Sequence, residues 1–347
     1  MKRCFNILLS LFAAMLVLTS CEHKDLCYHH PHTARVRIDV DWSQYSKPTP
    51  SGMSVHVYKT DGSQVLQSLT NTITHTYVNL DAGLYHSIVF NQSPSEYGSV
   101  TFKDLDNYNR ASVVTNKYVS RWYVARRGGS DEVAEQPEWI GADKQELMEV
   151  TEEMVEATSG YMTHESKGDQ RDYVIATHYP LNIIHTLNVK VHIKGIKNLR
   201  SARASLDGLS EGYIFRYEHP STALVTQLLE SWRLSTDKST TDAEGRPVDG
   251  YITSQITFFG MPTGHLGLPE ENYFYLSLLL VDGETQVDAP FYVGDRITRD
   301  PVKENTWNLI LTLEDPLPDV APETGPGAGF DATVDDWEEG EDITVGV

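Results

Sequence analysis

The chain has 347 residues, and its 49 acidic residues far outnumber its 28 lysines and arginines. Without residues 1–20, interpreted below as a cleaved leader, 26 basic residues remain and the formal charge is −23. A surface of this sign repels phosphates, which argues against nucleic acids and anionic lipid headgroups as partners. The 327 residues of the mature chain are enough for two domains of common size.

The N-terminus has the anatomy of an export signal. Residues 1–3 (MKR) are cationic, residues 7–18 are almost wholly apolar, and residues 18–20 (LTS) lead directly to Cys21. The apolar run is shorter than the roughly 20 residues that a membrane-spanning helix needs. We therefore expect this segment to be a signal peptide, residues 1–20, that is removed from the mature protein.

Small residues followed directly by cysteine resemble the lipobox of bacterial lipoproteins. On that resemblance Cys21 becomes the new N-terminus, with diacylglycerol on its thiol and a third acyl chain, such as palmitate, on its amine. Several acyl chains, at about 0.8 kcal/mol per buried CH₂, hold a soluble domain on a bilayer. The alternative is an ordinary secretory signal in which Cys21 is incidental. If Cys21 is acylated, only Cys27 remains, and no intrachain disulfide can form.

The first half of the mature chain predicts a tether followed by short strands. Residues 21–34 are polar and lack a hydrophobic period, as expected of a tether. Folded structure is expected from residue 35, because Val36, Ile38, Val40 and Trp42 alternate with polar residues. Further strand and turn signals lie at 53–57, Asp61-Gly62, 78–80, Ala82-Gly83 and 84–90.

Residues 131–160 interrupt the β pattern. Asp143 and Glu146 have the spacing of a capping box, and Leu147, Val150 and Met154 follow at helical spacing. We therefore expect a short helix here, packed on the outside or at the end of a sandwich.

The second half begins after Pro180, the predicted boundary between an N-terminal domain (35–180) and a C-terminal domain (181–347). Its clearest strand spans 187–193, where apolar and polar residues alternate without exception. Further signals are strands at 202–206, 251–259, 273–281 and 306–313, turns at Asp207-Gly208 and Asp282-Gly283, an extended linker at 314–330, and final strands at 331–337 and 341–347. Many short strands separated by turns predict an all-β fold with one short helix, built from antiparallel sandwiches.

A G-x-S-x-G pattern places Ser210 between Gly208 and Gly212. The nucleophile elbow of hydrolases needs a strand before this serine and a helix after it. The next residues, 213–215, read as strand instead. We interpret the pattern as a plain turn, with a hydrolase using Ser210 as the alternative.

The densest group of possible metal ligands lies in the tether. His23, His29, His30 and His32 with Cys27 could bind Zn²⁺ or Cu²⁺. A selective site needs surrounding groups that fix the ring orientations, and a flexible tether offers none. We predict adventitious binding only, hence no structural metal and no cofactor. No acid–base or metal-hydrolase constellation emerges, so we predict that the protein is not an enzyme.

The tryptophans offer the only sequence signal for sugar stacking. Trp42, Trp307 and Trp337 fall on apolar strand phases, which leaves Trp122 and Trp139 as candidates for contact with a ligand.

The chain resembles Bacteroidales cell-surface lipoproteins related to the fimbrillin-associated anchors and minor subunits, within the fimbrillin-like superfamily. In particular it is similar to a lipoprotein family whose mature chains begin with the same histidine-rich stalk. The resemblance covers essentially the whole chain and is carried by the lipobox ending in Cys21, CEHKDLCYHHPH leading into VRIDVDW, LDAGLYHSIVFN, TLNVKVHIKGIKNLRSARASLDGL, TWNLILTLEDP and GFDATVDDWEEGEDITV.

This resemblance implies two tandem transthyretin-like, Greek-key β-sandwich domains, displayed by a lipid anchor on the outside of the outer membrane. Glu22 and Asp25 fit the export signals of such lipoproteins. In the family, stalk subunits lose their first strand and accept a donor strand from a neighbour, whereas anchors keep their lipid. Because the tether precedes the first strand without an obvious processing loop, the expected role is a fimbrial anchor or minor subunit in cell adhesion, with a fimbrial subunit as protein partner.

The alternative function is that of a glycan-binding outer-membrane lipoprotein that accompanies a sugar importer. It predicts exposed aromatic pairs with Asn or Asp beside them. The sequence leaves open the identity of the protein or glycan partner, whether the protein polymerises, and whether the C-terminal strands complete its own sheet or that of a neighbour.

Overall fold

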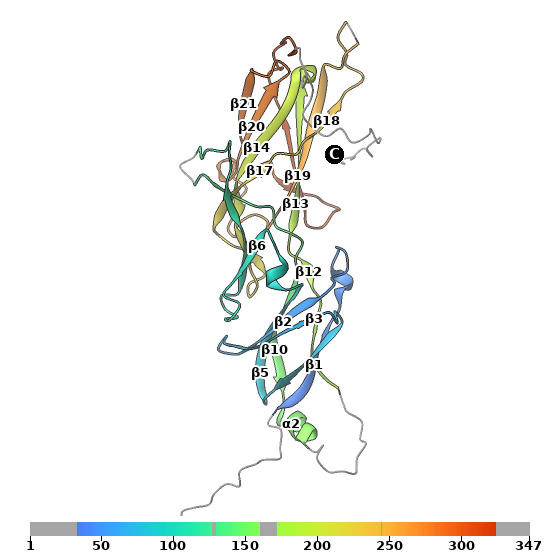
Figure 1. Ribbon diagram of the computed structural model, residues 1–347, viewed down its shortest axis with the longest axis vertical. Helices are drawn as coiled ribbons and strands as arrows, with labels where there is room; N and C mark the ends of the chain where they lie inside the picture. The colour runs from blue at the N-terminus through green and yellow to red at the C-terminus, as the bar shows by residue number, and fades with distance from the viewer. Residues whose placement is uncertain (1–32, 127–129, 160–171, 244, 324–347) are drawn as a thin grey trace, which may run out of the picture. The chain divides into compact units, whose positions relative to one another are not determined.

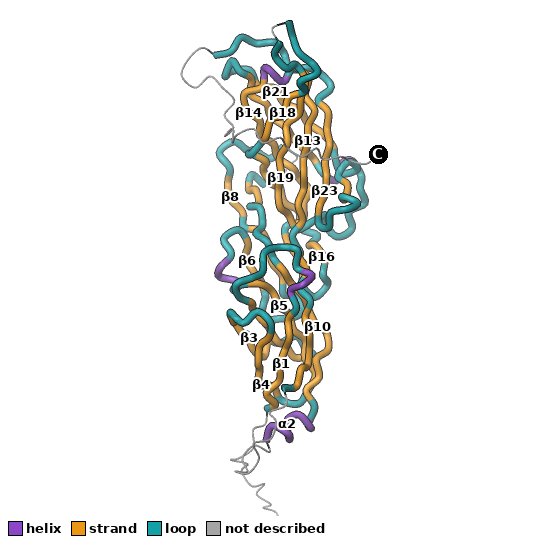
Figure 2. The backbone as a smooth tube through the Cα atoms, turned by 90° about the vertical axis from the view of Figure 1, so that its right-hand side faces the viewer, coloured by secondary structure: helices purple, strands orange, loops and turns teal. Residues whose placement is uncertain are grey.

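The computed structural model describes residues 33–126, 130–159, 172–243 and 245–323, and in these residues it contains five β-sheets and one α-helix. Strands dominate the trace, with helical segments confined to short stretches (Figure 2). The predicted all-β fold with one short helix is confirmed. No helix in these ranges is long and apolar enough to cross a membrane.

The first sandwich has two sheets, which we name after strands β5 and β7. Their strands are, in spatial order, β12 (Leu181–Asn182), β10 (Gly141–Val150), β5 (Gly83–Asn91), β2 (Met53–Lys59) and β3 (Gln64–Thr70) in the β5 sheet, and β16 (His219–Pro220), β15 (Gly212–Ile214), β7 (Ser112–Thr115) and β6 (Val100–Lys103) in the β7 sheet. A core rich in aromatic residues joins them, with Tyr58 and Phe90 from the β5 sheet and Val100 and Val113 from the β7 sheet.

The second sandwich also has two sheets, named after β13 and β14, whose strands stand side by side in Figure 1. The β13 sheet contains β18 (Arg233–Thr236), β19 (Asp249–Phe258), β13 (His185–Lys194), β23 (Thr306–Thr312) and β22 (Thr298–Arg299); the β14 sheet contains β21 (Gln286–Tyr292), β20 (Tyr273–Leu280), β14 (Leu199–Ser210), β17 (Leu224–Leu229), β9 (Glu132–Ala134) and β8 (Lys117–Val119). Alternate residues of β13, from Leu187 to Ile193, are buried against Leu206 and Leu276 of the opposite sheet.

The fifth sheet has three strands in the order β11-β1-β4, with β11 at Tyr173–His178, β1 at Ala34–Val40 and β4 at His75–Leu80. In β1 the residues Val36, Ile38 and Val40 are buried, as the alternation predicts. Trp42 does not continue the strand, because Asp41 caps a 3₁₀ turn at Trp42–Gln44 by accepting from the Ser43 amide at 2.9 Å. The other 3₁₀ turns are Pro94–Glu96, Ile196–Asn198 and Pro269–Glu271.

The two sandwiches share strands from both halves of the sequence. β15 and β16 follow β14 in the chain, but β15 pairs with β7, with Tyr213 opposite Val113, and β16 pairs with the other side of β15. In return β8 and β9, which precede residue 180, extend the β14 sheet through the parallel pairing of Ala134 with Gln227. The boundary at Pro180 stays a prediction.

The helix expected from Asp143 onward is wrong in position. Residues 141–150 form strand β10, and the helix α2 begins later, at Glu152–Ser159. The Asp143 carboxylate accepts from His178 and from the Tyr179 amide, at 2.8 and 3.0 Å, instead of capping a first turn. Met148 is buried while Leu147 is 69% exposed, which is the period of a strand. Tertiary pairing therefore overrides the capping signal.

One of the predicted turns is a β-bulge. Gly208 lies inside β14, where the register with β17 shifts between Leu206 and Leu209. Its φ of 83° is left-handed, and a Cβ there would lie 2.2 Å from the Glu271 carbonyl oxygen, so the position needs glycine. The turn predicted at Asp282-Gly283 is confirmed, since the Gly283 amide donates to the Leu280 carbonyl.

The predicted linker at 314–330 is fixed to the second sandwich over its described part. The Leu317 amide donates to Lys194 at 2.9 Å, and the Leu317 side chain is buried in the core. Asp319 accepts from Asn198 at 3.0 Å, and Arg200 donates to Glu323 at 2.7 Å. We name residues 314–323 the strap. The final strands expected at 331–337 and 341–347 lie outside the described residues.

Among the described residues, contacts within the chain define a small unit, 33–36, 79–83, 150–159 and 172–173, and a large unit, 37–78, 84–126, 130–149, 174–243 and 245–323. The small unit carries helix α2, with Glu152 and Glu153 in its first turn. The large unit contains the cores of both sandwiches.

Replacing Leu317 by Ala tests whether the strap is part of the second core. We expect the free energy of unfolding to fall by about 2–4 kcal/mol, because a buried leucine leaves a cavity. Chemical denaturation measures it, with Val302→Ala, at a residue 85% exposed, as the control that changes little. A loss below about 0.5 kcal/mol, typical of surface changes, would show that the strap is not anchored by this side chain.

His56 gives the first sandwich a pH dependence. Burial lowers the pKa of this histidine to about 4, whereas in the unfolded chain it titrates near 6.5. The unfolded state therefore binds the proton first, and stability should fall by up to about 3 kcal/mol as the pH drops from 6.5 to 4.

The variant His56→Gln should flatten this pH dependence when the free energy of unfolding is measured at intervals across the window. Part of it should remain, because burial also lowers the pKa of His185 to about 4. Parallel curves for wild type and variant would contradict the assignment to His56.

Candidate functional site

Of the residues singled out in the sequence, the proposed lipidation site and the histidine cluster cannot be placed. Cys21, Cys27 and the four tether histidines lie outside the described residues. Within the described ranges, no group of three or more His, Cys, Asp or Glu side chains has the arrangement of a metal site.

Ser210 lies where β14 ends and is buried. Its hydroxyl contacts the carbonyl oxygens of Gly212 and Ser221, each at 2.9 Å, and the Ser221 hydroxyl at 3.1 Å. The next residues form β15, not a helix. The serine therefore joins two backbone segments, and no described histidine is hydrogen-bonded to it.

A Ser–His–Asp arrangement that sequence reasoning missed lies in the first half. His178 Nε2 is 2.8 Å from the Ser87 hydroxyl, and its Nδ1 is 2.8 Å from the Asp143 carboxylate. These are triad distances, but Ser87 and His178 both have zero exposure. The Ser87 hydroxyl also contacts the Met148 sulfur at 3.2 Å. A nucleophile sealed in this way cannot reach a substrate, so the network joins strands β5, β10 and β11.

The electrostatics of this network fit a structural role. Burial acts to raise the pKa of Asp143, but the hydrogen bond and the charge of His178 and the Tyr179 amide outweigh it, so the pKa is lowered. The carboxylate stays ionised and holds the histidine in one orientation. No sequence motif could have revealed it, since its members are 87, 143 and 178.

The two tryptophans proposed for sugar stacking are both half-buried and covered by cations. The Arg203 guanidinium lies 4.8 Å from the Trp122 ring centre, and the Lys47 ammonium lies 3.4 Å from that of Trp139. Neither ring presents a free face of the kind the alternative function predicts.

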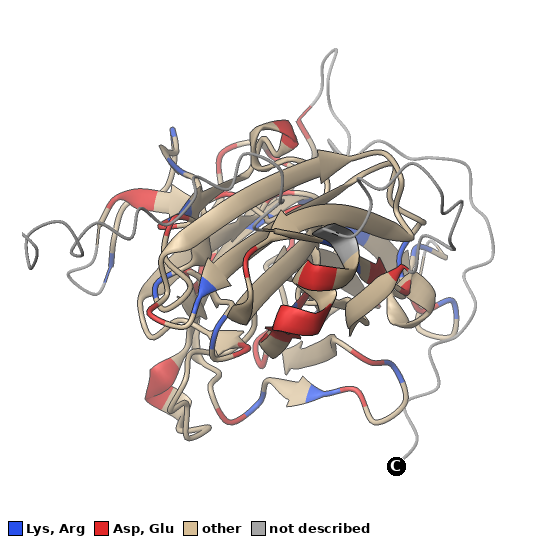
Figure 3. Cartoon of the chain, turned by 90° about the horizontal axis from the view of Figure 1, so that it is seen from below, with Lys and Arg blue, Asp and Glu red and all other residues tan. Residues whose placement is uncertain are grey.

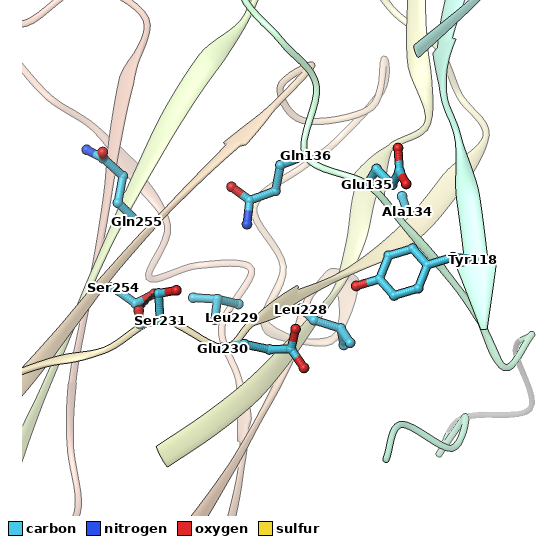
Figure 4. Close-up of a pocket in the computed structure, with 10 residues that line it drawn as sticks. All are labelled: Tyr118, Ala134, Glu135, Gln136, Leu228, Leu229, Glu230, Ser231, Ser254 and Gln255. Atoms are coloured by element: carbon cyan, nitrogen blue, oxygen red, sulfur yellow. Dashed lines mark hydrogen bonds between the residues drawn. The ribbon is translucent and has the colours of Figure 1, made fainter. Parts of the chain in front are cut away.

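A groove of about 480 Å³ opens in the second sandwich where β8, β9 and β17 face β19 (Figure 4). Ten residues line it: Tyr118, Ala134, Glu135, Gln136, Leu228, Leu229, Glu230, Ser231, Ser254 and Gln255. None of them is Lys, Arg or His. The groove offers one aromatic ring, two leucines and several neutral or acidic hydrogen-bonding groups.

Neighbouring residues orient two of the groove's side chains. The Trp122 indole donates to Oε1 of Glu230 at 2.6 Å. The Thr257 amide donates to Oε1 of Gln136 at 3.3 Å, and the Thr257 hydroxyl donates to the adjacent Pro137 carbonyl at 2.8 Å. In each side chain one terminal oxygen is engaged. The other terminal atom can contact a ligand; it is Oε2 in Glu230 and Nε2 in Gln136.

A second hollow of about 540 Å³ lies near Asp207 and His265. Two of its lining residues, Glu271 and His265, are engaged by the surrounding loop. Glu271 accepts from the amides of Leu266 and Leu268, and His265 lies 2.9 Å from Asn272 Oδ1. These bonds to backbone amides lower the pKa of Glu271.

The edges of the β13 and β14 sheets differ in how they are protected. β21 carries Pro290 and Asp288, which discourage pairing with another strand. On β23, the short strand β22 covers only Trp307 and Asn308. Among the described strands none pairs with the outer side of Ile310, whose side chain is 45% exposed.

Charge gives no second site. Acidic and basic residues are interspersed over the view in Figure 3, where helix α2 shows its acidic turns in red. Charges of opposite sign also pair directly, as in the partly exposed ion pair Lys117–Glu211, at 2.7 Å.

The comparisons with known proteins place the chain in a family. The model described as "Domain of unknown function (DUF5119)" matches residues 20–230, so the chain belongs to that family. No curated protein matches the sequence.

Three solved structures of Bacteroidales proteins are similar to this chain to different degrees. A candidate adhesin from Bacteroides ovatus has a TM-score of 0.55 and 14% identity, over 86% of this chain and 99% of that one. A second candidate adhesin, from Bacteroides thetaiotaomicron, has a TM-score of 0.48 and 11% identity, over 82% and 92%. The fimbrial anchor protein Mfa2 from Porphyromonas gingivalis has a TM-score of 0.45 and 11% identity, over 81% and 90%. The first of these confirms the expected resemblance at the level of the fold.

A fluorophosphonate probe, which labels activated serines, tests both serine arrangements. We expect no labelling of Ser87 or Ser210, because both hydroxyls are buried and engaged. Mass spectrometry of the treated protein is the readout, with a known serine hydrolase as positive control. A labelled peptide containing either residue would establish a reactive nucleophile.

Proposed function

We propose that this DUF5119 protein is a non-catalytic surface lipoprotein that serves as an anchor or minor subunit of a fimbria-like assembly. Acyl chains on Cys21 hold it on the outer membrane, facing the cell exterior, and residues 21–34 form the tether. The two sandwiches, 35–180 and 181–347 with strands exchanged between them, form the displayed body. Its partner is another protein subunit.

The observation that carries this proposal is the fold shared with the Bacteroides ovatus candidate adhesin over nearly the full length of both chains. The family match begins at residue 20, one residue before the cysteine expected to start the mature protein. The buried serines add support, since neither has the access that catalysis needs.

The outer edge of β23 is the surface best suited to a protein partner. Backbone groups alternate sides along a strand, and the Asp300 amide donates to Thr306 on the outer side. Ile310 and Thr312 lie an even number of residues after Thr306, so their backbone amides and carbonyls point to the same outer side of β23. β22 does not extend far enough to cover them. An added strand could pair there through main-chain hydrogen bonds, with the exposed Ile310 side chain contributing specificity.

Lipid attachment is tested by growing cells with an alkyne analogue of palmitate and comparing wild type with Cys21→Ser. We expect label and outer-membrane fractionation for wild type, and loss of both for the variant, because serine offers no thiol to acylate. Cys27→Ser is the matched control and should keep the label.

Access of an external protease to intact cells tests the orientation, and wild type should be digested. An unlabelled wild-type protein, or one found free in the periplasm, would overturn the anchoring role.

A further inference from the structure

The groove of Figure 4 goes beyond the proposed function, since nothing about lipid attachment or assembly requires it. Its volume of about 480 Å³ lies within the range of small-molecule sites. All ten lining residues belong to the large unit of the chain.

One side of the groove is lined by strand β19, which among the described strands leaves the backbone of Gln255 without a strand partner on the side away from β13. On the side of β19 that faces away from β13, the Asp249 carbonyl accepts from the Asp237 amide, and the Thr257 amide donates to the Gln136 side chain. Backbone groups alternate along a strand, so the amide and carbonyl of Gln255 face the same side. Strand β18 pairs with β19 only as far as Thr253. Among the described residues Gln255 therefore has no strand partner on this side.

The opposite wall supplies an aromatic ring with a polar end. Tyr118 is 37% exposed, and its hydroxyl makes no hydrogen bond to the described residues. In Figure 4 this hydroxyl and the Gln136 amide nitrogen point into the same space, with Glu230 beside them. Partial burial, together with the charges of Glu230 and Glu135, raises the pKa of Tyr118, so the phenol remains a donor at neutral pH.

These groups define the chemistry of the ligand. The donors are the Tyr118 hydroxyl, the side-chain amide of Gln136 and the backbone amide of Gln255. The acceptors include Oε2 of Glu230. Hydroxyl groups donate and accept, so a ligand with several adjacent hydroxyls satisfies both kinds. The Tyr118 ring and the leucine side chains offer apolar surface to the C–H face of a sugar ring.

Charge and length exclude the other ligand classes. Two glutamates without a lining cation repel phosphates, uronic acids and other anions. An extended peptide needs a run of unpaired backbone groups, but here only Gln255 is free between the pairing of Thr253 and the capping of Thr257. A single sugar ring can bind the backbone groups of one residue, whereas an extended peptide strand cannot pair there.

We infer that this groove binds a neutral saccharide, held by Tyr118, Gln136, Glu230 and the backbone of Gln255. The half-buried tryptophans play no part in it, apart from Trp122, which orients Glu230.

Saturation-transfer NMR on the unacylated mature chain, residues 21–347, tests the site. The probes are the methyl glycosides of glucose, galactose, mannose and N-acetylglucosamine, with methyl glucuronide as the anionic comparison and a capped Thr-Val-Thr-Val peptide as the strand comparison. We expect saturation transfer to at least one neutral glycoside, and about tenfold weaker binding of the glucuronide and the peptide.

Three groove variants and one control locate the binding. Tyr118→Ala should weaken it at least about tenfold, whereas Tyr217→Ala, at another exposed tyrosine, should leave it unchanged. Tyr118→Phe and Glu230→Gln preserve side-chain volume and should each weaken binding several-fold, which keeps the test decisive if the alanine variant does not fold. No binding of any neutral glycoside, preferred binding of the glucuronide or the peptide, or unchanged binding in all three groove variants would overturn the proposal.

Discussion

The pairing of β15 with β7 is the constraint on which the rest of the fold depends. Gly212 approaches β7 so closely that a Cβ would lie 2.1 Å from the Val113 carbonyl oxygen. Just beyond it, Phe215 is buried in the first core, with ring centres 5.9 Å from Phe90 and 6.0 Å from Phe102. A segment from the second half of the sequence thus fills the core of the first sandwich. Because β8 and β9 make the reverse exchange, neither sandwich is complete without the other half of the chain.

The buried polar groups join neighbouring strands. Ser210 lies at the crossing from β14 to β15, and its hydroxyl contacts the carbonyl oxygens of Gly212 and Ser221, which both follow that crossing. The Ser87–His178–Asp143 network joins strands β5, β10 and β11. Buried polar groups that are fully paired fix one arrangement of strands. The groove beside Tyr118 differs, because its polar groups are oriented but not all engaged.

The sequence predicted the strands well where one face of a sheet is buried. Alternation located β1, β13 and β23, because a two-residue period directly reports burial on one face. It failed at β10, where the local capping signal of Asp143 and Glu146 competes with a partner, His178, that lies 35 residues away. It also failed at Gly208, because a turn and a bulge require the same left-handed glycine.

The sites were less predictable than the fold. Tyr118, Gln136, Glu230 and Gln255 come from four separate segments, and only sheet pairing brings them together. The strand exchange was likewise invisible, since β9 and β15 are each three residues long and carry no register signal of their own. The sequence also gave no sign that Leu317 and Asp319 of the strap hydrogen-bond to Lys194 and Asn198.

The central claim is that the exchanged strands make the two sandwiches one cooperative folding unit. Differential scanning calorimetry of the intact mature chain tests it most directly. The account predicts a single transition whose calorimetric enthalpy equals its van't Hoff enthalpy, as for a two-state unit. Two resolved transitions, each with the enthalpy of about half the chain, would contradict it and would show that each sandwich folds without the strands it receives from the other.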